Sequence, residues 1–228
     1  MTVQSADQEP AGDTVRHPLF ARFYKRLSES ADVRAGVGAH REELLAGLKG
    51  RVIEIGPGNG LNFARYPTTV SQLIAVEPEP HLRKLATAAA QHARVPVDVV
   101  PGNAQSLPVP DESCDAAVCS LVLCSLSDVR QALLELRRVL RPGGELRFYE
   151  HGRAEQRRGM MRAQRALDAT VWPRLFGGCH TGRDPVGEIG AAGFTNVSFR
   201  RLLVPQDGPV LPSSFHVLGS ARCPGEPR

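Results

Sequence analysis

The chain has 228 residues, a hydrophobic fraction of 42% and a formal net charge of +4, which fit one α/β domain with a sizeable core. No apolar run reaches the roughly 18 residues that cross a bilayer, and the first residues lack the basic and apolar blocks of a signal peptide. The basic residues are scattered, which argues against a nucleic acid partner. We therefore expect a cytoplasmic protein without stable membrane insertion.

The amino-terminal part divides into an arm and two helices. Residues 1–15 are polar and show no period, which predicts a disordered arm before a single domain over 16–228. Within 16–50, "HPLFARFYKRLSES" carries one apolar stripe, and "HREELLAGL" follows. We expect these helices to form a lid over the site. Tyr24 and Phe20 either line an acceptor pocket or pack the first helix, and we favour packing. We interpret His40 and Arg41 as polar residues on an exposed helix end.

From residue 51 short apolar runs alternate with helical patterns, as in a parallel sheet covered by helices on both faces. The core over 51–151 precedes substrate-side helices over 152–195 and final strands over 196–228. The predicted strands are Val52–Ile55, Leu73–Val76, Val97–Val100, Ala116–Ser120 and Glu145–Glu150, followed by two runs near 196–203 and 214–221. Predicted helices lie near 61–66, 80–93, 128–140 and 155–170.

A glycine-rich loop follows the first strand. Glu54 to Gly60 reads acidic-x-Gly-x-Gly-x-Gly, so bare backbone can turn tightly and lie against a ligand. A dinucleotide fold prefers Gly-x-Gly-x-x-Gly, which disfavours a nicotinamide oxidoreductase. The alternative is a purely structural turn.

The second strand ends in an acid, Glu77, within "LIAVEPEP". At the carboxyl edge of the neighbouring strand this side chain can accept hydrogen bonds from both hydroxyls of a ribose. Alone, it could simply cap the next helix. The loop and the acid together indicate an adenosine-containing ligand.

Four motifs occur in order: "VIEIGPGNG", "AVEPEP", "PGNAQSLPVPDESCDAAVCSLVLCSL" and "ELRRVLRPGGELRFYEH". Over residues 50 to 150 the chain thereby resembles the class I S-adenosylmethionine-dependent methyltransferases. The resemblance implies a doubly wound α/β fold, with a mostly parallel seven-stranded sheet whose last strand is antiparallel. It also implies that S-adenosylmethionine lies across the carboxyl ends of the first strands.

The resemblance also implies roles for residues. Gly56, Gly58 and Gly60 would hold the methionine end of the cofactor, Glu77 the ribose, and Asn103 with Ala104 the adenine. The set of predicted cofactor-binding residues further includes Glu54, Pro78 and Ser120. Many relatives carry an aspartate where this chain has Asn103, whose carbonyl still accepts a hydrogen bond but brings no charge.

The stretch "CSLVLCS" after the fourth strand concerns the methyl acceptor. It lacks the Asn/Asp-Pro-Pro-Tyr/Phe motif of enzymes that methylate nucleobases or amides, and its apolar residues favour a small or lipophilic acceptor. With "WPRLFGGCHTGRD" and "HVLG" it resembles the alkyl-thiol S-methyltransferases and their soluble relatives, which implies a lipophilic thiol. Nitrogen, oxygen or lipid-headgroup acceptors, and a cofactor-binding protein without turnover, are the alternatives. We expect a monomer or weak dimer.

His151 is the predicted catalytic residue, because it ends the fifth strand beside Glu150 at the cofactor edge. It would act as a base or orient the acceptor; otherwise it is a surface or helix-entry residue. His216 is a further candidate for the pocket. His180 and Arg183 are also candidates, although Thr181 with Asp184 fits a capping box for the next helix.

The five cysteines form an odd set with no CxxC pair and no His/Cys spacing typical of zinc. The sequence therefore predicts free thiols and no metal centre. Cys119 and Cys124 lie near the cofactor edge, where we interpret them as small apolar residues.

Overall fold

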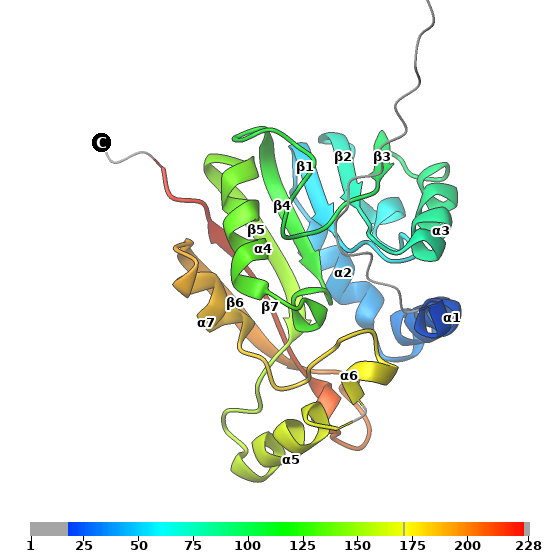
Figure 1. The fold of residues 1–228 in the computed structure, drawn as a ribbon, viewed down its shortest axis with the longest axis vertical. Helices are drawn as coiled ribbons and strands as arrows, with labels where there is room; N and C mark the ends of the chain where they lie inside the picture. Colours follow the sequence, from blue (N-terminus) through cyan, green and yellow to red (C-terminus); the bar gives the residue numbers. More distant parts are fainter. Residues whose placement is uncertain (1–17, 171, 226–228) are drawn as a thin grey trace, which may run out of the picture.

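A seven-stranded sheet runs through the centre of the computed structural model (Figure 1). The model describes residues 18–170 and 172–225, so the predicted arm over 1–15 lies outside the described residues. The strands stand in the order β3-β2-β1-β4-β5-β7-β6. Their bounds are β1 Gly50–Ile55, β2 Val70–Val76, β3 Val97–Val100, β4 Cys114–Ser120, β5 Leu140–His151, β6 Thr195–Leu203 and β7 Phe215–Arg222.

The pairing confirms the predicted doubly wound fold. β1 pairs in parallel with β2 and β4, and β4 pairs in parallel with β5. β7 runs antiparallel to both β5 and β6. The central strands are buried on both faces, which is why their sequences read as continuous apolar runs.

Helices cover both faces and gather at the carboxyl edge, where α1, α5 and α6 lie beyond the sheet in Figure 1. The apolar stripe predicted before "RPGG" is α4, with Leu133 and Leu136 fully buried and Asp128 capping its first turn. No described helix is long and apolar enough to span a membrane. The helices are α1 Pro18–Arg34, α2 Val37–Leu45, α3 Pro80–Ala90, α4 Val129–Val139, α5 Arg158–Asp168, α6 Trp172–Leu175 and α7 Pro185–Ala191, with short 3₁₀ turns η1 Phe63–Arg65, η2 Leu123–Ser125 and η3 Pro212–Ser214.

The predicted helix over 61–66 is only the single turn η1. Gly60, directly before the predicted range, has φ of 79°, outside the helical region, and η1 begins only after its N-cap Asn62. Tyr66 leaves it in an extended conformation because Pro67 follows and disfavours a helical residue before it. The chain is therefore confined between two residues that do not allow a longer helix.

Candidate active site

One large cavity of about 920 Å³ opens at the carboxyl edge of the sheet. Side chains from α1, from the loops after β1, β2 and β4, and from residues 172–183 form its wall. The wall brings together seven of the residues that the sequence predicted for the site: Gly56, Gly58, Glu77, Pro78, Asn103, Ala104 and His151.

Glu77 joins the glycine loop to the end of β2. Its Oε2 accepts from the Gly58 amide at 3.0 Å, and its Oε1 accepts from the Glu79 amide at 3.0 Å. Burial raises the pKa of this carboxyl to about 7, although the two backbone donors favour the charged form. Each carboxylate oxygen keeps a lone pair that can accept from a ligand in the cavity.

The loop after β1 requires glycine because neighbouring side chains lie directly against its backbone and leave no room for a Cβ. Gly56 and Gly58 both have φ of 60°. A Cβ on Gly56 would lie 2.5 Å from the Val122 side chain, and one on Gly58 would lie 2.6 Å from the Tyr24 ring. Tyr24 thus packs against the glycine loop and lines the cavity, which is the alternative that the sequence analysis did not favour. The side chain of Phe20 lies outside the described residues.

Three predicted cofactor-binding residues are absent from the described cavity wall: Glu54, Gly60 and Ser120. Glu54 is buried and accepts from Asn62 Nδ2 at 2.6 Å and from the Tyr66 hydroxyl at 2.9 Å. A Cβ on Gly60 would lie 2.8 Å from that of Ala89. These residues contact the interior of the protein instead of the described cavity.

We expect the Glu54→Gln variant to change how stability depends on pH. Burial raises the pKa of Glu54 from 4.5 to about 6, so the folded state favours the protonated acid. The resulting contribution, about 2 kcal/mol, is present below pH 4.5 and is lost as the pH rises through 6. In urea titrations the parent should therefore lose about 2 kcal/mol more than the variant between acid and neutral pH. Parallel stability curves would contradict this assignment.

Arg41 is not on an exposed helix end, so that prediction is wrong. Its side chain is buried, with Nε 3.1 Å from Asp32 Oδ1. Its Nη1 donates to Asn62 Oδ1 at 2.9 Å and to Ser120 Oγ at 3.0 Å. Arg41 therefore ties α2 to α1, to the loop after β1 and to the end of β4, and it lines the cavity.

Three side chains from distant segments meet at the other end of the cavity: Cys124 of η2, His151 at the end of β5, and Cys179 after α6. The two sulfur atoms lie 3.7 Å apart. The possible ligand atoms of all three residues lie within 4.8 Å of one another. His216, opposite His151 in the register, also lines the cavity, and the two rings are 4.3 Å apart.

Glu150 holds η2 in place. This fully buried carboxylate accepts from the amides of Val122 and Leu123 at 3.0 Å and of Cys124 at 3.3 Å. Burial raises its pKa to about 7 against the effect of these donors. Cys124 is thus positioned by the residue next to His151.

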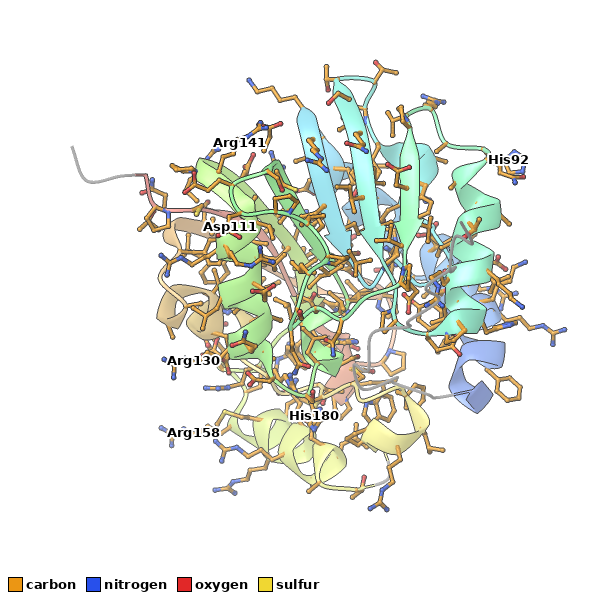
Figure 2. All side chains as sticks on the ribbon, turned by 45° about the horizontal axis from the view of Figure 1, so that its top comes forward. His92, Asp111, Arg130, Arg141, Arg158 and His180 are labelled. Carbon is orange, nitrogen blue, oxygen red and sulfur yellow. The ribbon has the colours of Figure 1, made fainter. Side chains whose placement is uncertain are left out.

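The segment that carries Cys179 is bound to the same turn. The His180 amide donates to the Cys124 carbonyl at 2.9 Å, and Arg183 Nη1 donates to the Leu123 carbonyl at 2.9 Å. Figure 2 shows His180 just beyond the sheet, close to α5. Both residues line the cavity.

The capping box predicted from Thr181 and Asp184 is wrong. Asp184 does cap α7, through the Gly187 amide at 2.9 Å. The Thr181 hydroxyl instead donates to Asp168 of α5 at 3.0 Å. This hydrogen bond fixes the end of the Cys179 segment to the helix behind it.

Electrostatics favour a thiolate at Cys179 beside a charged imidazole. The Cys124 thiol lowers the pKa of Cys179, burial opposes this, and His151 lowers it further. Burial alone would lower the pKa of His151, but Cys179 and Glu150 raise it above its ordinary value. Burial and the neighbouring His151 hold the pKa of His216 well below the usual range.

Sequence analysis missed Cys179 and Glu150, and it interpreted Cys124 as merely apolar. Cys124 and Cys179 are 55 positions apart, so no local spacing joins them. Cys119 is buried in β4 and is not part of the described cavity wall. Only the position of Glu150 beside His151 could have signalled its role.

Comparisons with known proteins identify the family to which this chain is similar. A family model described as "Methyltransferase domain" matches residues 53–148. The thiol S-methyltransferase TMT1B of Rattus norvegicus is 34% identical over 211 residues, which cover 89% of this chain and 82% of that protein. The thiol S-methyltransferase TMT1A of Homo sapiens is 33% identical over 165 residues, covering 70% and 67%.

Solved structures share the fold. The structure of a SAM-dependent methyltransferase from Thermotoga maritima, described as a possible histamine N-methyltransferase, has a TM-score of 0.66. It is 22% identical, and the match covers 90% of this chain and 98% of that one. At this identity the likeness concerns the fold alone.

Proposed function

Since the chain belongs to the S-adenosylmethionine-dependent methyltransferase family that includes the thiol S-methyltransferases, we propose that it methylates the sulfur of a small lipophilic thiol. The observation that carries the proposal is one cavity with two chemically different ends. Gly58 and Glu77 lie at one end, and Cys124, His151 and Cys179 lie at the other.

The first end fits S-adenosylmethionine. Glu77 offers lone pairs at the cavity wall, and Gly56 and Gly58 present backbone without side chains. Asn103 also lines this end; its Oδ1 accepts from the Gln105 amide at 3.0 Å and keeps a second lone pair for a donor such as an adenine amino group. S-adenosylmethionine supplies a methyl group that is activated by the sulfonium charge.

The second end suits an acceptor that is apolar apart from its sulfur. Leu121, Val122 and Phe176 add apolar surface to the cavity wall, and Val122 also lies against Gly56. A thiol with a pKa of about 8.5 is already a few per cent thiolate at neutral pH, so orientation in line with the methyl group can supply much of the rate. The relatives that are named thiol S-methyltransferases support this acceptor class.

Tyr24 lines the same cavity, and its ring lies against Gly58. Burial raises the pKa of its phenol, Arg41 opposes this, and Glu77 and Cys124 both raise it further. The phenol therefore stays protonated at neutral pH and can donate a hydrogen bond within the cavity.

We expect the His151→Ala variant to separate acceptor chemistry from cofactor binding. Because His151 lies at the acceptor end, kcat/KM for a lipophilic thiol should fall about 100-fold. The dissociation constant for S-adenosylhomocysteine should stay close to that of the parent. His92→Ala is the matched control, because His92 is exposed and far from the cavity (Figure 2). Equal rates for His151→Ala and His92→Ala would remove His151 from the mechanism.

The acceptor class is tested with a panel of thiols, amines, phenols and lipid headgroups. The proposal expects the highest kcat/KM for lipophilic thiols. Preferred transfer to an amine, a phenol or a headgroup would replace the thiol by that acceptor. Tight cofactor binding without transfer to any of them would instead indicate a binding protein.

The remaining parts of the proposal concern the cell and the assembly. We infer a cytoplasmic monomer or weak dimer that acts on small molecules and not on nucleic acid. Five free, buried cysteines support a reducing compartment.

A further inference from the structure

We propose that Cys124, His151 and Cys179 bind one zinc ion, whose fourth coordination position faces the cavity and receives the sulfur of the acceptor. This inference rests on the proposed function and deepens it, because it assigns His151 as a metal ligand. It departs from the sequence-based prediction of no metal centre.

The geometry of the three side chains fits such an ion. Two thiolates on tetrahedral zinc, with Zn–S bonds of about 2.3 Å, are separated by about 3.8 Å, and the two sulfur atoms here are 3.7 Å apart. A sulfur and an imidazole nitrogen on the same ion are separated by about 3.6 Å. All the ligand atoms lie within 4.8 Å of one another, so each sulfur–nitrogen distance has to shorten by no more than about 1.2 Å.

The donor set is that of a catalytic zinc site. Two cysteines and one histidine are a known three-ligand set that leaves the fourth position open. Glu150 is already occupied by three backbone amides and does not compete for the ion. Nδ1 of His151 is buried without a hydrogen-bond partner, a state that normally costs free energy.

The surroundings hold the ligands as outer-shell groups do in metal sites. Glu150 fixes the backbone of Cys124, and the His180 amide donates to the Cys124 carbonyl. A Cβ on Gly178 would lie 2.7 Å from the Ser125 carbonyl, so only glycine allows the Cys179 segment to approach this closely. The two sulfur atoms are thus brought together by main-chain contacts.

The open position gives the ion a role in the proposed reaction. Cys124, His151 and Cys179 all line the cavity, so an acceptor thiol can reach zinc and lose its proton to solvent on binding. A lone pair of its sulfur then forms the new S–CH₃ bond. The bond from the methyl carbon to the sulfonium sulfur breaks, and its electron pair stays on that sulfur. The products are a neutral thioether and S-adenosylhomocysteine, with no change in the oxidation state of zinc.

A disulfide between Cys124 and Cys179 is the main competing arrangement. It requires the sulfur atoms to approach to about 2.05 Å and needs an oxidant. It also leaves His151 without a role. The third ligand and the open cavity therefore favour the metal.

The test uses Co²⁺ as a spectroscopic probe for zinc in the full-length, metal-free protein. We expect one Co²⁺ per chain, with sulfur-to-cobalt charge-transfer bands and the visible bands of tetrahedral cobalt. A lipophilic thiol should shift these bands without S-adenosylmethionine. Cys124→Ser and Cys179→Ser should lose both sets of bands, while Cys223→Ser, which removes a thiol from the far end of the sheet, should keep them. Titration with S-adenosylhomocysteine checks that each variant is folded.

Two results would overturn the metal site. One is a parent protein that binds S-adenosylhomocysteine but, after reduction of any Cys124–Cys179 disulfide, shows no tetrahedral cobalt bands. The other is a metal-free protein that methylates thiols at the parent rate, which would leave the proposed function intact. Conversely, cobalt bound through the three residues with methyl transfer only to amines would support the metal site and overturn the thiol acceptor.

Discussion

Replacing Glu77 by alanine is expected to raise the dissociation constant for S-adenosylhomocysteine about 100-fold, or about 2.7 kcal/mol at 25 °C. A buried carboxylate that accepts from ribose hydroxyls makes charge-assisted hydrogen bonds, each of which contributes about 1.5–3 kcal/mol. The variant also leaves the amides of Gly58 and Glu79 without their acceptor, so the glycine loop loses a support. Isothermal titration calorimetry measures the change directly.

The pH dependence of this binding separates the carboxylate from a general loss of structure. The pKa of Glu77 is about 7 in the ligand-free protein because of burial. Ribose donors favour the ionised form, so cofactor affinity of the parent should rise as the pH increases through 7, whereas Glu77→Gln should lack this rise. Unchanged affinity in Glu77→Ala would remove Glu77 from the cofactor site.

The second large effect is on stability. Asp32→Ala should lower the free energy of unfolding by about 3–5 kcal/mol, because it leaves the buried Arg41 guanidinium without its counterion. The same carboxylate also pairs with Arg65 Nη2 at 2.6 Å. Urea denaturation of parent and variant at neutral pH measures the loss.

Asp111→Ala is the matched control for this prediction. Asp111 pairs with Arg138 Nη1 at 2.6 Å, but its side chain is 74% exposed. Figure 2 shows Asp111 far from His180, which lines the cavity. An exposed ion pair contributes less than about 1 kcal/mol to stability. Equal losses of unfolding free energy in Asp32→Ala and Asp111→Ala would therefore show that the buried pair stabilises the protein no more than the exposed one.

The meeting of the glycine loop with Glu77, which we propose as the cofactor end, was predictable because its signal is local. The glycine loop and Glu77 each follow directly after an apolar strand, and parallel strands present their carboxyl ends at one edge. Sequence order alone therefore places Gly58 beside Glu77. Their hydrogen bond of 3.0 Å agrees with this expectation.

The acceptor end was not predictable because its contacts are tertiary. Cys124, His151 and Cys179 come from three segments. The side chains of Glu150 and Arg183 and the amide of His180 join these segments, and such contacts leave no mark on residue spacing. Arg41 was misjudged for the same reason. The predicted helix began at His40, whereas α2 begins at Val37, and the partners that bury Arg41 lie on α1, after β1 and at the end of β4.

The measurement that tests the central claim most directly is single-turnover transfer from S-adenosylmethionine that carries a deuterated methyl group. A lipophilic alkyl thiol and the matched alkyl amine and alcohol are offered together, and the products are identified by mass spectrometry. The predicted result is the deuterated methyl thioether, formed with one equivalent of S-adenosylhomocysteine. Label on the amine or the alcohol, with none on the thiol, would contradict the assignment of this cavity to thiol methylation.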